Sequence, residues 1–86
     1  MALHTLHDPQ KAVDCCKRAY ANDAVIIMDE AAWSLASIAN LEWPCPLYVY
    51  ADDLSITGAK APNSVSVATV DDWLQLTIDH PQHIAW

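Results

Sequence analysis

The sequence predicts an α/β fold, a small three-layer domain with a four-stranded, mainly parallel sheet. Short apolar runs of strand length alternate along the chain with segments whose apolar residues recur at helical spacing. The runs are apolar almost throughout instead of alternating with polar residues, which is typical of strands covered by helices on both faces. Strands that alternate with helices in this way are joined by right-handed crossovers into a parallel sheet.

The first half of the chain supplies two strands and two helices. Residues 2–6 form a short apolar segment that ends at a turn. Asp8 can cap a helix with Pro9 at its first position, and this helix continues through the sequence PQKAVDCCKRAYA. The apolar run 24–30 predicts the next strand, and residues 31–39 predict the next helix.

The second half repeats this order with a weaker middle helix. Residues 47–51 predict a third strand, followed by at most a short helical turn that Gly58 closes. Residues 65–69 predict the fourth strand. Thr69 and Asp72 form a variant of the capping box ahead of the last helix. A proline ends that helix, and the sequence QHIAW follows as an apolar tail.

Composition limits the size and the partners of the molecule. The 86 residues make one domain, 1–86, and 53% of them are apolar, which is more than a small monomer easily buries. We therefore expect a partner surface or an oligomer. The net charge of −7 and the supply of only 4 basic residues argue against direct nucleic-acid binding.

The sequence predicts a cytoplasmic protein with reduced thiols. Its beginning, MALHTLHDPQ, lacks the basic region and long apolar core of a signal peptide. No apolar run approaches the ~18 residues of a membrane span. The 3 cysteines are an odd number, and two of them are adjacent, which does not suit a secreted disulfide framework.

Common ligand-binding motifs are absent from the sequence. It has one glycine, no glycine-rich phosphate loop and no C-x-x-C pair, so we expect no cofactor. The histidine pairs His4/His7 and His80/His83 lack a third anchored ligand. We expect them to be solvated at the ends of elements and to hold no metal.

Three pairs of acidic residues fall at strand ends or helix starts. They are Asp29–Glu30, Asp52–Asp53 and Asp71–Asp72. The carboxyl ends of parallel strands line the usual ligand crevice, so acids there could be catalytic. Acids at helix N-termini are also stabilised by the helix dipole, and we expect this capping role.

The adjacent cysteines of the first helix are expected to differ in exposure. Cys16 lies at helical spacing with the apolar residues Ala12, Val13, Ala19 and Tyr20, so it is predicted to be buried. Cys15 lies between Lys11 and Arg18, a setting that favours the thiolate of an accessible thiol. The alternative is that Cys15 is an incidental surface residue. Cys45, held between two prolines, is expected to be structural.

The aromatic residues suggest an interface at the end of the chain. Trp86 and the neighbouring Ile84 are candidates for partner anchors, because aromatic residues are favoured at interfaces. The alternative is that Trp86 folds back onto its own sheet. Trp33 and Trp73 lie at helical spacing with apolar neighbours and are expected in the core.

Four segments together resemble the DsrH/TusB family, over essentially the whole chain from Leu3 to Trp86. They are LHTL, AVIIMDEA, LYVYADDLSITG and VDDWLQLTIDHPQHIAW. The resemblance implies a flavodoxin-like, DsrE-like fold. It also implies assembly with TusC/DsrF-like and TusD/DsrE-like chains into a dimer of heterotrimers, whose principal persulfide cysteine lies on the TusD/DsrE-like chain.

For function, the resemblance implies a subunit of a TusBCD-like sulfur relay that supports 2-thiolation of the tRNA wobble uridine. A DsrH-type component of sulfur oxidation is the alternative within the family. Some members carry a cysteine in the first helix. Counting back without gaps from VIIMDEA places it at Cys15, or at Cys16 if the helix is shifted by one residue.

Three hypotheses follow. As a persulfide carrier, Cys15 would accept sulfur with Lys11 and Arg18 supporting its thiolate. As a scaffold, which we favour, the chain would only position its partners. The runner-up is a stand-alone homo-oligomeric domain that binds a small sulfur or anionic ligand at the strand ends. An independent enzyme with its own small substrate ranks third, because no complete catalytic constellation is visible.

Overall fold

The structure is a computed structural model that describes residues 1–86, built around one five-stranded parallel sheet in the order β4-β3-β2-β1-β5. The strands are β1 (Ala2–Leu6), β2 (Ala24–Ile27), β3 (Leu47–Tyr50), β4 (Val65–Ala68) and β5 (Gln82–Ala85). The predicted α/β class and the parallel sheet are confirmed. The predicted number of four strands is wrong, because β5 forms within the expected tail.

The sequence does not predict strand β5, because β5 lies at the edge of the sheet. It pairs only with β1, in a register that places His83 beside Leu3 and Ala85 beside Thr5. Three of its four residues are exposed and the fourth is half-buried. An edge strand with open faces does not need the continuous apolar run that marks a covered strand, so the sequence QHIA carries little strand signal.

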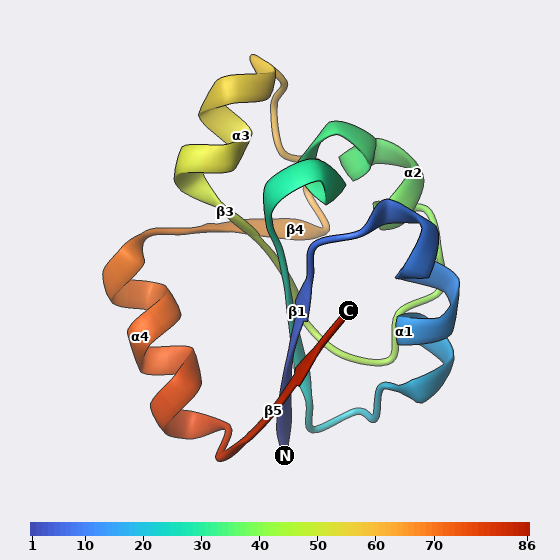
Figure 1. Cartoon of the computed structure of the whole chain (residues 1–86), viewed down its shortest axis with the longest axis vertical. Helices are drawn as coiled ribbons and strands as arrows, with labels where there is room; N and C mark the ends of the chain where they lie inside the picture. The colour runs from blue at the N-terminus through green and yellow to red at the C-terminus, as the bar shows by residue number, and fades with distance from the viewer.

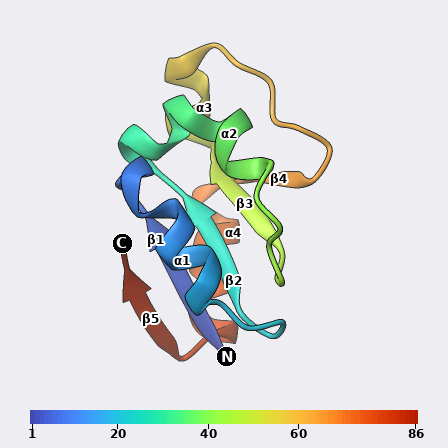
Figure 2. The same ribbon diagram turned by 90° about the vertical axis from the view of Figure 1, so that its right-hand side faces the viewer.

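Helices cover both faces of the sheet (Figures 1 and 2). Helices α1 (Ala12–Arg18) and α2 (Leu35–Ala39) lie on one face, and α4 (Val70–Asp79) lies on the other. Helix α3 (Ala51–Thr57) follows β3 at the carboxyl end of the sheet. Two 3-10 helices, η1 (Pro9–Lys11) and η2 (Asp29–Ser34), lead into α1 and α2.

The predicted helix ends are accurate where a side chain or a glycine defines them. Asp8 caps η1 by accepting a hydrogen bond from the N–H of Gln10 at 2.9 Å, with Pro9 at the first position. Gly58 ends α3 in the left-handed conformation, with φ of 69°. Thr69 and Asp72 form the complete capping box of α4. The middle helix, α3, runs for seven residues instead of a single turn.

Helix α1 faces the sheet with a different side from the predicted one. Its buried residues are Ala12 and Cys15, followed by Ala19, whereas Val13 and Tyr20 are exposed. Spacings of three and four residues occur on every side of a helix, so they do not decide which side is buried. The buried side of α1 carries small side chains, which let the helix approach the sheet closely. The backbone of Ala19 is already extended (φ −69°, ψ 146°), so Tyr20 leaves the helical path.

Two apolar clusters form the core, one on each face of the sheet. The larger one, under α1 and α2, has 12 buried residues, and the smaller one, under α4, has 6. Trp73 packs against the smaller cluster, as expected. The expected burial of Trp33 is wrong, because its side chain on η2 is 66% exposed. A 3-10 helix does not keep the 3.6-residue period on which that expectation rested.

Removing the capping box should weaken α4 measurably. We expect Thr69→Ala to lower the free energy of unfolding by about 1 kcal/mol, because the hydroxyl of Thr69 accepts from the N–H of Asp72 at 3.2 Å. Urea unfolding followed by circular dichroism measures this loss. Thr69→Ser keeps the hydroxyl and serves as the control. A Thr69→Ala variant as stable as Thr69→Ser would contradict the role of the cap.

Candidate functional site

The structure reverses the predicted exposure of the adjacent cysteines. Cys15 is fully buried in the larger core cluster, with 0% of its surface exposed. Cys16 is half-buried, and its Sγ lies 3.3 Å from the backbone carbonyl oxygen of Glu42. The prediction of an accessible thiol at Cys15 is therefore wrong, because α1 rests on the sheet through Cys15 itself.

The buried thiols are held in the protonated form. Burial, with smaller contributions from Cys45, Cys16 and Asp23, raises the pKa of Cys15 to about 12. Burial, Asp23 and Cys16 raise the pKa of Cys45 to about 11. For Cys16, burial and then Glu42 raise the pKa. Every one of these influences disfavours the nucleophilic thiolate.

The two cations predicted to support a thiolate at Cys15 lie elsewhere. Lys11, at the end of η1, and Arg18, at the end of α1, are both exposed. The guanidinium of Arg18 lies over the ring of Tyr20, 5.6 Å from its centroid. That contact keeps the charge at the surface, away from the buried sulfur.

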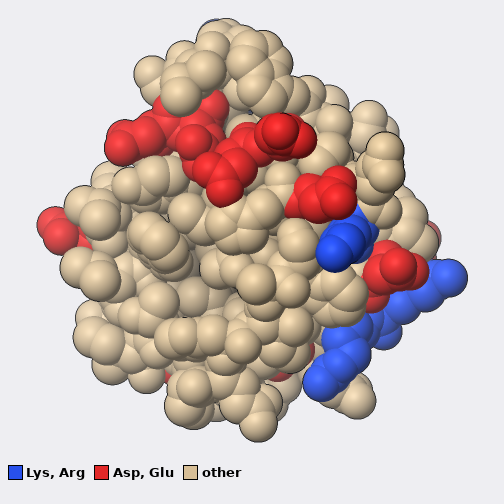
Figure 3. Space-filling model, viewed as in Figure 1, with Lys and Arg blue, Asp and Glu red and all other residues tan.

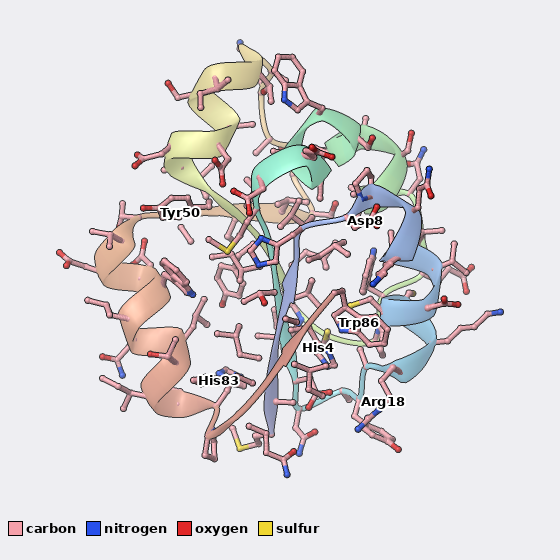
Figure 4. The ribbon with its side chains drawn as sticks, viewed as in Figure 1. His4, Asp8, Arg18, Tyr50, His83 and Trp86 are labelled. Atoms are coloured by element: carbon pink, nitrogen blue, oxygen red, sulfur yellow. The ribbon has the colours of Figure 1, made fainter.

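A buried hydrogen-bond chain joins Trp86, His4 and Asp23. Figure 4 shows two of its members, His4 and Trp86, next to each other. The indole Nε1–H of Trp86 donates to Nδ1 of His4 at 3.0 Å. Because the indole can only donate, Nδ1 of His4 accepts, and the proton of the neutral ring is on Nε2. That Nε2–H donates to Oδ2 of Asp23 at 3.0 Å. The expectation that His4 is solvated is wrong, and so is the same expectation for His80, which is also buried.

Asp23 remains ionised inside the protein. Burial alone would raise its pKa, but hydrogen bonds from His4 and from the N–H groups of Tyr20 and Ala2 lower it to about 2. The Ala2 and Tyr20 bonds are both 2.9 Å long. A carboxylate that accepts several such bonds is stabilised in its charged form.

The end of the chain folds back onto its own sheet. The N–H of Trp86 donates to the carbonyl of Thr5 at 2.8 Å. The carbonyl of Trp86 accepts from the N–H groups of His7 and Asp8, each at 3.2 Å. Of the two alternatives for Trp86, docking within the chain is the one observed. Ile84 is half-buried on β5, where it pairs with His4.

Acidic side chains gather where β2 and β3 end. Oδ2 of Asp29 contacts Nδ1 of His7, and the backbone N–H of Asp29 donates to Oδ2 of Asp53 at 2.8 Å. Asp29 also has a positive φ of 50°. Figure 3 shows acidic side chains across this upper part of the molecule, and most of the basic ones over the opposite side, near α1. Asp53 thus closes the turn after β2, in addition to lying in the first turn of α3.

Two surface grooves are present, and neither contains a cysteine or a histidine. A groove of about 390 Å³ lies between the start of α1 and α2, with Gln10, Ser34 and Ser37 as its polar residues. A second one, of about 200 Å³, lies beside α4 and includes Asp72 and Asp79. No group of three or more His, Cys, Asp or Glu side chains is arranged to hold a metal ion.

Comparison of the chain with models of known protein families and with curated proteins found no match. None of its helices has the length and apolar character that crossing a bilayer requires.

The sequence contains a signal for the buried network, although the pairing of His4 with Asp23 was not predicted. His4 lies in the middle of a strand that is buried almost throughout, and Asp23 immediately precedes the next strand. Parallel pairing sets Leu3 beside Ala24, which brings the two polar side chains together. A histidine within a covered strand needs a buried partner, and an acid one residue before the paired strand is a suitable candidate.

The network should make stability depend on acid. The folded pKa of Asp23, about 2, lies below the value of about 3.9 for an unfolded Asp. Its contribution is therefore present above pH ~4 and is lost as the pH falls toward 2. We expect Asp23→Asn to lower the free energy of unfolding by about 1–3 kcal/mol at pH 7 and to flatten its fall between pH ~4 and ~2. Urea unfolding at several pH values tests this, with the exposed Asp79→Asn as the control.

The rate of alkylation in the native protein should differ among the three thiols. With a pKa of about 12, only about one Cys15 in ten thousand is ionised at pH 8. We expect iodoacetamide to modify Cys16 first and Cys15 last in the native protein, and all three at similar rates in urea. Peptide mass spectrometry over time measures the order. Native labelling of Cys15 as fast as Cys16 would contradict the buried placement.

Proposed function

We propose that this chain is a structural subunit of a cytoplasmic, TusBCD-like sulfur-relay complex that supports 2-thiolation of the tRNA wobble uridine. The resemblance to the DsrH/TusB family over Leu3 to Trp86 supplies the class of complex. The burial of Cys15 supports the scaffold form over the carrier form. A thiol with no exposed surface and a raised pKa is a poor acceptor of sulfur from another protein.

The fold is compatible with this proposal. A parallel α/β sheet with helices on both faces fits the flavodoxin-like, DsrE-like architecture that the resemblance implies. The partners would be TusC/DsrF-like and TusD/DsrE-like chains, and the second of these would carry the principal persulfide. The net charge of −7 agrees with contact to protein partners and not to tRNA directly.

The charge at the strand ends disfavours the stand-alone anion-binding alternative. Asp29 and Asp53 lie where β2 and β3 end, and His7 is already paired with Asp29. An anion at this edge would face carboxylates instead of free N–H groups or cations. The DsrH-type role in sulfur oxidation uses the same assembly and differs only in the pathway it serves.

A sulfur-transfer assay on the assembled complex tests the scaffold role. We expect the complex to pass sulfur from a persulfidated donor to its acceptor while Cys15 remains unmodified in peptide mass spectra. Cys15→Ser and Cys16→Ser complexes should relay sulfur within about twofold of the wild-type rate. Sulfur found on either cysteine, and discharged when the acceptor is added, would establish a carrier instead.

The pathway is tested in cells. In a host that lacks its own TusB-like chain, expression of this protein with its partners should restore 2-thiouridine in tRNA, measured by nucleoside mass spectrometry. An assembled complex that fails to restore it would favour the sulfur-oxidation role.

A further inference from the structure

The indole of Trp86 is held by a hydrogen bond whose acceptor can take up a proton. Its Nε1–H donates to Nδ1 of His4 at 3.0 Å. The comparable bond of Trp43 runs from its Nε1–H to the backbone carbonyl of Ile38 at 2.7 Å. A carbonyl oxygen accepts over the whole pH range in which a protein is folded, whereas an imidazole nitrogen accepts only while it carries no proton. The docking of Trp86 therefore depends on the protonation state of His4.

The second proton of His4 has only one atom to bind. In the neutral ring, Nε2 already carries a proton and donates it to Oδ2 of Asp23 at 3.0 Å. A histidine ordinarily takes up its second proton between about pH 8 and about pH 5, and in His4 that proton must add to Nδ1. The N–H groups of His4 and Trp86 would then face each other across the former hydrogen bond, as two donors without an acceptor.

The carboxylate of Asp23 favours the charged form of His4. Its position is fixed by hydrogen bonds from the N–H groups of Ala2 and Tyr20, and it is ionised. An imidazolium at His4 would form an ion pair with this anion across the existing 3.0 Å contact, so β1 and β2 need not move. Protonation thus strengthens the side of the network that faces Asp23 and breaks the side that faces Trp86.

The other groups packed around His4 are uncharged. Its neighbours on β2 and β5 are Val25 and Ile84, which have no titratable group. On the same side of the sheet, α1 contributes the thiol of Cys15 and the segment before β3 contributes the thiol of Cys45, and both thiols are protonated. The charged residues of α1 are all exposed; they are Asp14, Lys17 and Arg18.

The position of Trp86 lets its side chain leave without opening the sheet. The indole is partly buried against the larger core cluster, just beyond the edge strand β5 and on the side of the sheet where α1 lies (Figure 4). The backbone of Trp86 is tied separately, by its N–H to the carbonyl of Thr5 and by its carbonyl to the N–H groups of His7 and Asp8. Rotation of the side chain alone would bring its Nε1–H to water, which replaces the lost acceptor.

We infer that Trp86 is a pH-sensitive latch on the larger core cluster: its indole is docked while His4 is neutral and is released when Nδ1 of His4 takes up a proton. Release uncovers the part of the cluster that Trp86 packs against, while β5 stays paired with β1 through its backbone. The ion pair of His4 with Asp23 keeps the rest of the network in place. The latch is a property of this chain alone and does not rest on the proposed function.

Hydrogen exchange of the indole N–H groups tests the latch. NMR spectra of protein labelled with a nitrogen isotope resolve the indole signals, and the signal lost in Trp86→Phe identifies Trp86. We express protection as the exchange rate of a free indole divided by that of the protein at the same pH. Between about pH 7.5 and about pH 5 we expect the protection of Trp86 to fall at least about tenfold and that of Trp43 to change less than about twofold. The imidazole nitrogen shifts of His4 report whether Nδ1 takes up its proton over the same range.

Two variants at the network sharpen the test. His4→Gln has no titratable group at this position, so the protection of Trp86 should be the same at both pH values if the variant folds. Asp23→Asn keeps His4 and removes the anion beside it, so release should move to lower pH by at least about one unit. The exposed Asp79→Asn removes a charge elsewhere and should leave the midpoint of release unchanged.

Three results would overturn the inference. In the first, His4 takes up its proton while the indole of Trp86 stays as protected as before. In the second, Nδ1 of His4 remains unprotonated down to about pH 5, so that the latch has no trigger. In the third, Trp43 loses protection together with Trp86, which would mean that the whole domain unfolds.

Discussion

The hydrogen-bond chain from Trp86 through His4 to Asp23 is the constraint that fixes how the strands of this sheet are paired. It joins the end of β5, the middle of β1 and the residue just before β2, positions 82 and 19 residues apart along the chain. A shift of one residue in β1 would turn His4 to the opposite face of the sheet. The imidazole and the carboxylate of Asp23 would then be buried without partners, at a cost that apolar side chains in the same places would not impose.

The same network disfavours a reactive thiolate at the neighbouring cysteines. Asp23 is held as an anion by its hydrogen bonds, and its charge is one of the influences that raise the pKa of Cys15 and of Cys45. An acid fixed beside buried sulfur is opposite to the cationic setting of a reactive cysteine. The interaction that secures the strand order therefore also disfavours thiolate chemistry in α1, which supports the proposed scaffold role over the carrier role.

The sequence predicted the covered strands, the capped helix ends and the α/β class because each has a local cause. Continuous apolar runs mark β2 and β3, and the caps at Asp8 and Thr69 are short motifs. Strand β5 was missed since it takes its conformation from pairing with β1 and not from its own residues.

The side of α1 that faces the sheet was wrongly predicted for a related reason. Both Ala12–Cys15 and Ala12–Cys16 are helical spacings, so the choice depends on the close approach of α1 to the sheet, which is a tertiary effect. The pairing of His4 with Asp23 likewise exists only once β1 and β2 are aligned. The orientation of α1 and the pairing of His4 with Asp23 define the candidate site. Sequence patterns alone therefore predicted the fold better than the chemistry of the site.

The distribution of apolar residues is consistent with the proposed assembly. Only 23 of its 86 residues are buried, while nine large hydrophobic side chains are exposed. Three of these nine, Val70, Leu74 and Ile78, lie at spacings of four residues along α4. A small domain has little core with which to offset the entropy of folding. A partner that binds only the folded chain adds its binding free energy to the stability of the fold. In the proposed assembly, a partner that buries such exposed apolar side chains would therefore stabilise the fold of this chain through the same contacts that form the complex.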